Sequence, residues 1–223
     1  AYTPRAMLYV ACSGFPVPVS RYWSLFPAVE ISDTELGIPG TGTIRRWLRE
    51  SPDGFAFTAL APKELGESGF RKTKENKALI TAFVDFCGNL GAQALVFQAP
   101  PEFKHGKASK AAVKAFLNWL PKDLPHLVMD LPSWKPADVA SACGKRTVSA
   151  AYDPLLDEPP PETPFVYARL PGPAGHRSRY DEESVDEISA HCQTLQEKAE
   201  LAFCIFRNID MQANASGVLA KLK

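Results

Sequence analysis

Eight short apolar segments recur along the chain with room for a helix between most of them, and this alternation constrains the fold more than any other feature. The segments are residues 7–14, 28–32, 55–62, 92–98, 126–131, 146–154, 165–170 and 201–208. Helical patterns occupy residues 21–26, 44–50, 74–89, 109–120, 136–144, 181–199 and 218–222. Eight strands that alternate with helices predict an α/β protein with a parallel sheet, typical of the TIM-type (β/α)8 barrel. An open doubly wound sheet is the competing interpretation.

The residue pattern inside each segment separates strands from helices. In 28–32, Val29 and Ile31 alternate with small or polar residues, which is the period-two pattern of a strand. In 74–89, apolar residues recur at helical spacing and the pattern stops before Gly91. Residues 155–164 are short and rich in proline, so we expect a degenerate crossover between the sixth and seventh strands. No internal repeat or low-complexity linker interrupts the chain, and residues 1–223 are expected to form a single domain.

Charge and cysteine content narrow the class of protein. The chain has 25 basic and 25 acidic side chains, a balance that gives no general attraction for nucleic acid or an anionic membrane. No apolar run approaches the roughly 20 residues of a membrane span, and no signal-type segment is visible. The five cysteines are widely spaced and odd in number, which indicates reduced core residues. We therefore expect a cytoplasmic protein whose partner is a small polar or anionic molecule; the sequence leaves its oligomeric state open.

The stretch 165–180 is expected to hold the functional end of the fold. Arg169 arrives at the end of a predicted strand, just before the proline and glycine that stop it. The loop that follows carries His176, Arg177 and Arg179, and barrels often bind phosphate after the seventh strand. A solvated loop without a ligand is the alternative interpretation. The acidic start of the next helix, 181–183, argues against a phosphate placed directly on that helix.

Polar residues also end several other predicted strands, and active sites of barrels lie at these ends. Strand parity predicts that five of them line a common cavity: Glu30, Gln98, Asp130, Arg169 and Asn208. Carboxylates suit proton transfer, a guanidinium suits an anion and amides orient a ligand, so the predicted catalytic residues are Glu30, Asp130 and Arg169. The predicted ligand-binding residues are Ser13, Gln98, Trp134, His176, Arg177, Arg179 and Asn208. The alternative is that Arg169 only forms an internal ion pair with Glu30 or Asp130.

Neither a metal nor a cofactor is expected. The histidines, His105, His126, His176 and His191, lack the paired spacing of metal ligands, and no Cys-x-x-Cys occurs. Gly40-Thr-Gly42 precedes a helix but lacks the lysine of a P-loop and the spacing of a dinucleotide fingerprint. Gly-x-Ser-x-Gly is also absent.

Short motifs at the strand ends resemble one known family. The matching pieces are Ser13-Gly14, Val29-Glu30-Ile31, Phe55-Ala-Phe with Ala61-Pro62, residues 96–101, Ser133-Trp134, residues 169–172 and residues 206–208. In their order and spacing they resemble the YecE-like family, bacterial proteins that carry the domain of unknown function 72. The resemblance runs from about Tyr9 to Asn208 and implies a TIM-type barrel without an established reaction.

The departures from that family's pattern leave two functional hypotheses open. Leu60 stands where the resemblance leads us to expect a lysine, and Pro171 stands where it leads us to expect a histidine. The first hypothesis is a metal-independent hydrolase or isomerase that acts on a small anionic or sugar-like molecule, which rests on analogy of fold. The alternative is a ligand-binding or interaction module that has lost the family's pocket chemistry.

Overall fold

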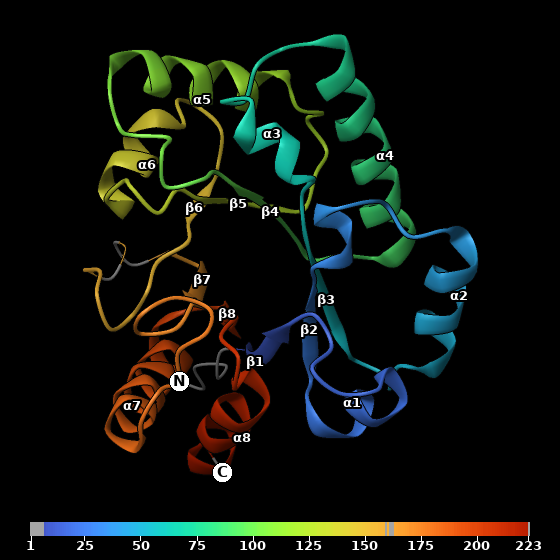
Figure 1. Cartoon of the computed structure of the whole chain (residues 1–223), viewed down its shortest axis with the longest axis vertical. Helices are drawn as coiled ribbons and strands as arrows, with labels where there is room; N and C mark the ends of the chain where they lie inside the picture. Colours follow the sequence, from blue (N-terminus) through green and yellow to red (C-terminus); the bar gives the residue numbers. More distant parts are fainter. Residues whose placement is uncertain (1–6, 159, 161–162, 223) are drawn as a thin grey trace, which may run out of the picture. The chain divides into compact units, whose positions relative to one another are not determined.

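The computed structural model describes residues 7–158, 160 and 163–222, in which strands and helices alternate along the chain (Figure 1). The strands are β1 Met7–Ser13, β2 Ala28–Ile31, β3 Ala56–Leu60, β4 Ala94–Gln98, β5 His126–Asp130, β6 Ser149–Ala150, β7 Phe165–Leu170 and β8 Leu201–Phe206. The helices are α1 Val19–Leu25, α2 Thr41–Glu50, α3 Lys63–Glu67, α4 Lys74–Leu90, α5 Lys107–Trp119, α6 Pro136–Ala142, α7 Glu182–Lys198 and α8 Met211–Lys221, with a 3-10 turn, η1, at Asp33–Glu35.

The predicted fold class is confirmed: within the described residues, eight parallel strands alternate with helices in the (β/α)8 pattern of TIM-type barrels. The largest differences from the predicted elements concern β6, α8 and α3. β6 is only two residues long, α8 begins seven residues earlier than the helix expected at 218–222, and α3 occupies part of a segment expected to be loop. Between β6 and β7 the described residues form no helix, as the degenerate crossover predicts, while residues 159, 161 and 162 lie outside the described part. The single-domain assignment stays a prediction.

The chain divides into two compact units. The first comprises Ala1–Glu30, Pro52–Ala56 and Ala151–Lys223, and its strands lie in the order β2-β1-β8-β7. Their register pairs Ser13 with Glu30, Ala11 with Ile205, and Arg169 with Ile205. The second comprises Ile31–Ser51 and Phe57–Ala150, with strand order β3-β4-β5-β6.

In the first unit, alternate residues of β8 face opposite sides. Cys204 and Phe206 face the helices, because Cys204 contacts Cys192 of α7 and Phe206 packs edge-on against Tyr180. The opposite face begins with an aromatic layer in which the ring centroid of Phe203 lies 5.2 Å from that of Tyr9 and 5.6 Å from that of Tyr167. Further toward the C-terminal ends of the strands, this face becomes polar. The aromatic layer thus fills one end of this face and leaves the charged residues at the other.

In the second unit, β4 packs on its helices through Phe97. The Phe97 ring lies 6.0 Å from Phe83 of α4 and 5.3 Å from Phe116 of α5, measured between centroids. Gln98, the next residue, therefore faces away from these helices, and it pairs with Asp130 of β5. Helix α3 approaches the end of β4 so closely that a Cβ at Gly66 would lie 1.8 Å from the carbonyl oxygen of Gln98.

Gly66→Ala is therefore expected to destabilise the protein by about 1–3 kcal/mol, because the added methyl forces α3 away from β4. Gly88→Ala is the matched control: Gly88 lies in α4, and a Cβ there meets nothing within 4 Å. Alanine favours a helix interior, so this control should leave the free energy of unfolding unchanged or raise it. Urea unfolding of both variants measures the difference, and equal stabilities would contradict the close approach.

Candidate functional site

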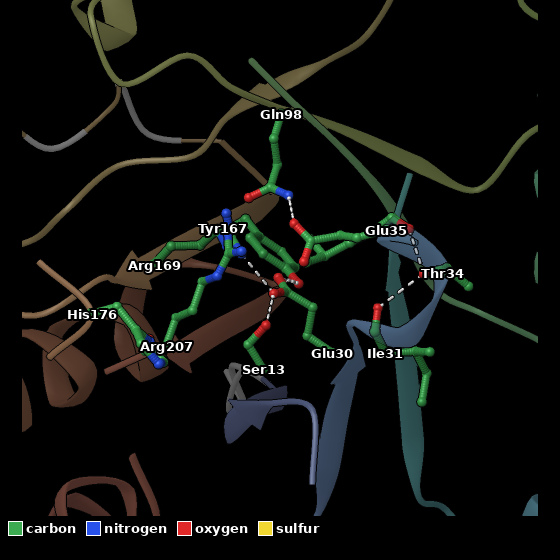
Figure 2. A network of polar contacts seen from close by, with 11 residues as sticks. Ser13, Glu30, Ile31, Thr34, Glu35, Gln98, Tyr167, Arg169, His176 and Arg207 are labelled. Atoms are coloured by element: carbon green, nitrogen blue, oxygen red, sulfur yellow. Dashed lines mark hydrogen bonds and ion pairs between the residues drawn. The ribbon is translucent and has the colours of Figure 1, made fainter. Parts of the chain in front are cut away.

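The centre of the polar face in the first unit is the carboxylate of Glu30, whose residue is 0% exposed. Its Oε1 accepts hydrogen bonds from Ser13 Oγ at 2.6 Å and from Arg169 Nη2 at 2.7 Å. Its Oε2 accepts a third from the Tyr167 hydroxyl at 2.7 Å. Figure 2 shows these three side chains converging on Glu30 from β1 and β7. One buried carboxylate thereby links β1 and β2 with β7, which lies far from them in the sequence.

This arrangement confirms the ion pair that the sequence left as an alternative role for Arg169. The Glu30–Arg169 bridge is nearly fully buried, with the Arg169 side chain 6% exposed. Because a buried carboxylate needs compensating donors, these three hydrogen bonds satisfy Glu30 and fix Arg169 and Tyr167 in place. The geometry suits positioning more directly than proton transfer. The catalytic roles assigned to Glu30, Asp130 and Arg169 stay predictions.

The sequence analysis missed two members of this polar face, Tyr167 and Arg207. Arg207 follows β8, and its backbone N–H donates to the Leu170 carbonyl at 2.9 Å, which extends the β7–β8 ladder. Since Ile205 pairs with Arg169, Arg207 lies two residues further along the same face. It is half-buried. Arg207 could have been identified from the alternation along β8, in which it follows Phe203 and Ile205 at intervals of two residues.

Asn208, by contrast, does not lie on the face to which the sequence assigned it. Its Nδ2 donates to Asn214 Oδ1 of α8 at 2.8 Å and to the Ser178 carbonyl at 3.2 Å. The expected inward orientation was wrong by one residue, because β8 keeps its alternation through Arg207 and turns Asn208 toward the helices. Asn208 therefore joins the loop after β7 to α8.

The loop at 172–180 is bound closely to the segment that follows β8. The backbone N–H of Ile209 donates to the His176 carbonyl at 2.6 Å, and Arg179 forms an exposed ion pair with Asp210 at 3.0 Å. His176 Nδ1 lies 2.6 Å from the Arg207 carbonyl oxygen; a carbonyl only accepts, so Nδ1 carries the hydrogen. Arg177 is exposed and has no ion-pair partner among the described residues.

At Gly172 this loop depends on the absence of a side chain. Its φ is +103°, and a Cβ would lie 2.2 Å from the Gly175 carbonyl oxygen. The Gly172 N–H donates to the Tyr180 hydroxyl at 2.8 Å, so the two ends of the loop are joined. These contacts give the loop a defined conformation over the segment that carries Arg207.

The second unit holds the remaining predicted residues. Gln98 Nε2 donates to Glu35 Oε1 at 2.7 Å. Asp130, a second half-buried acidic residue, is the neighbour of Gln98 on the adjacent strand β5. Figure 2 shows the Gln98 amide directed at Glu35, which lies in η1 and was not predicted. Trp134 is 6% exposed, stacks on Phe103 and donates from Nε1 to the Phe103 carbonyl, a packing role rather than an open platform. The common cavity expected for residues of both units stays a prediction.

The five cysteines are buried and free of disulfides. Burial raises the pKa of the Cys12 thiol to about 12 and that of Cys143 to about 11, so neither forms a reactive thiolate near neutral pH. Burial also lowers the pKa of His191, whose Nε2 lies 2.6 Å from the Tyr152 hydroxyl oxygen.

Within residues 7–158, 160 and 163–222, no three His, Cys, Asp or Glu side chains gather as metal ligands. In the same residues, no helix has the length and apolar character of a membrane span.

The chain was compared with known families, curated proteins and solved structures. The sequence model of a family described as "Protein of unknown function DUF72" matches residues 17–223. A DUF72 family protein from Enterococcus faecalis V583 superposes with a TM-score of 0.77 at 21% identity, over 99% of both chains. Another, from Thermotoga maritima MSB8, gives 0.78 at 18% identity over 97% of this chain and 99% of that one.

A more distant likeness agrees on the fold. A xylose isomerase-like TIM barrel/4-hydroxyphenylpyruvate dioxygenase fusion protein gives a TM-score of 0.57 at 14% identity, over all of this chain and 42% of that one. At these identities the structural likenesses show the fold alone. The search of curated proteins gave no match.

The Glu30–Arg169 pair should show strong energetic coupling. Glu30→Gln or Arg169→Met alone leaves a buried charge without its counter-ion and should cost about 3–5 kcal/mol. The double variant removes both charges and should cost clearly less than the sum of the two.

An exposed ion pair supplies the control for that cycle. Lys63 Nζ and Glu67 Oε1 lie 3.4 Å apart with both side chains about half exposed, so Lys63→Met and Glu67→Gln should couple by no more than about 0.5 kcal/mol. Urea unfolding at pH 7 gives both cycles. If the changes in the free energy of unfolding caused by the Glu30 and Arg169 substitutions were additive, the buried ion pair would be contradicted.

Proposed function

We propose that this chain, which belongs to the DUF72 family of proteins of unknown function, binds a small anionic or sugar-like molecule at the C-terminal ends of β1, β2, β7 and β8. The observation that carries the proposal is the composition of this face: one carboxylate, Glu30, and two guanidinium groups, those of Arg169 and Arg207. An anion adjacent to this face would meet an excess of positive charge.

The arrangement of the first unit supports this ligand class. Arg169 is fixed by Glu30 before any ligand arrives, and fixed donors bind with a smaller loss of conformational freedom. His176 and Arg177 are presented on a loop that is bonded to the backbone of Arg207 and Ile209. Arginine also matches the planar geometry of carboxylates and phosphates.

Arg207→Gln should weaken binding of sulfate or phosphate about tenfold, because a hydrogen bond between charged groups is worth about 1.5–3 kcal/mol. Arg21→Gln on α1 is the matched control: Arg21 is an exposed arginine of the same unit and should leave the affinity unchanged. Isothermal titration calorimetry measures both. Equal affinities of wild type and Arg207→Gln would remove the support for this site.

A second candidate function is a metal-independent hydrolase or isomerase, favoured by the pair of half-buried carboxylates beside Gln98. Glu35 accepts a hydrogen bond from this amide, and Asp130 is the strand neighbour of Gln98 in the second unit, a composition suited to hydroxyl recognition and proton transfer.

For this candidate, purified protein incubated with a panel of sugar phosphates should convert one of them, as followed by NMR. Asp130→Asn should abolish the conversion, whereas Asp123→Asn, an exposed carboxylate before β5, should not. Substrate turnover that survives Asp130→Asn would contradict this role, and binding without conversion would favour a non-catalytic module.

A further inference from the structure

A basic groove in the second unit lies along the first turns of α4, outside the residues assigned to the site above. It is shallow and open to solvent, with a volume of about 820 Å³. It is lined by Lys72, Thr73, Lys74, Lys77, Ala78, Thr81, Ala82, Asp85 and Trp119. The α4 members recur at spacings of three and four, so they form one face of the helix.

The floor and one wall of the groove suit a flat apolar group. Part of the lining consists of short side chains on α4, those of Ala78, Thr81 and Ala82, which leave space above the helix. Trp119, the last residue of α5, also lines the groove and is half-buried. Lys77 Nζ lies 5.2 Å from the centroid of the Trp119 ring, which places an ammonium over the indole face. At an exposed site such a pair is worth only about 0.5–1 kcal/mol, so an aromatic ligand can replace the ammonium on the indole face.

The other wall suits negative charge. None of Lys72, Lys74 and Lys77 forms an ion pair with a residue in the described part of the chain, unlike Lys63, which pairs with Glu67. They lie at the N-terminal end of a 17-residue helix, where the helix dipole adds positive potential. Asp85 is the acidic member of the lining, two turns further along.

The loop that carries Lys72 is held in place before a ligand arrives. Buried Asn76 donates from Nδ2 to the Arg71 carbonyl at 2.7 Å and to Ser68 Oγ at 2.9 Å. Thr73 Oγ1 in turn accepts the Asn76 N–H and caps the helix. The lysines before and within the first turn therefore have a fixed backbone, which lowers the cost of ordering them around a ligand.

We propose that this groove binds a nucleoside diphosphate, with the base against Trp119 and the phosphates beside Lys72 and Lys74. An aromatic ring joined to two or more negative charges is the chemistry that matches a lining with one tryptophan and three lysines that form no ion pair in the described part of the chain. The site is separate from the proposed anion site of the first unit and does not depend on it.

Adenosine 5′-diphosphate is the probe, measured by calorimetry and by tryptophan fluorescence. Wild type should bind it with a dissociation constant on the order of 10⁻⁴ M, at least tenfold more tightly than adenosine or inorganic phosphate. Trp119→Leu should weaken binding about tenfold through loss of stacking, and Lys74→Gln should weaken it about threefold and reduce its salt dependence. Circular dichroism establishes that Trp119→Leu is folded.

Two control variants separate this proposal from its competitors. Lys107→Gln removes an exposed lysine at the start of α5, outside the groove, and should leave the affinity unchanged. A large loss of diphosphate affinity in Arg207→Gln would assign the diphosphate to the first unit and overturn the groove proposal. Equal affinity of Trp119→Leu and wild type for the diphosphate would overturn it as well.

Discussion

The carboxylate of Glu30 is the group on which the functional end of the first unit depends. An ionised carboxylate in a site without water costs several kcal/mol unless donors compensate it. Ser13, Tyr167 and Arg169 supply those donors from β1 and β7. A shift in the register of β1 or β7 would break at least one of these hydrogen bonds. The buried carboxylate would then lack a donor, and its desolvation cost would no longer be offset. The same bonds that favour the observed register therefore also orient Arg169.

Along the strands of the first unit, the aromatic side chains lie toward one end and the charged side chains toward the other. Tyr9, Tyr167 and Phe203 fill the face toward the N-terminal ends, and the arginines follow toward the C-terminal ends. The connections after β7 and β8 are bonded to each other through His176 and Arg207. This organisation matches the general rule that barrel folds use one end of their strands for stability and the other for ligands.

The sequence predicted the strand alternation and the ends at which polar residues gather, because both follow from local periodicity. For Arg169 it left open a catalytic role or an ion pair with Glu30 or Asp130; the structure shows the pair with Glu30, and the catalytic role stays a prediction. It misplaced Asn208. The sequence does not show how far the strand alternation continues beyond the last apolar residue of β8, and this decides which face Asn208 takes. Glu35 could not be predicted, because it reaches Gln98 from a 3-10 turn, 63 residues away in the sequence. Tertiary contacts of this kind have no local pattern.

If Glu30 positions Arg169 for an anionic ligand, such a ligand should be found beside this arginine in a crystal. Crystals grown with selenate, a heavy-atom analogue of sulfate, show the anion by its anomalous scattering. The account predicts a selenium peak within hydrogen-bonding reach of the Arg169 or Arg207 guanidinium, with Glu30 still bound to Ser13 and Tyr167. A map with selenate only elsewhere on the molecule, or with Glu30 released from these partners, would contradict it.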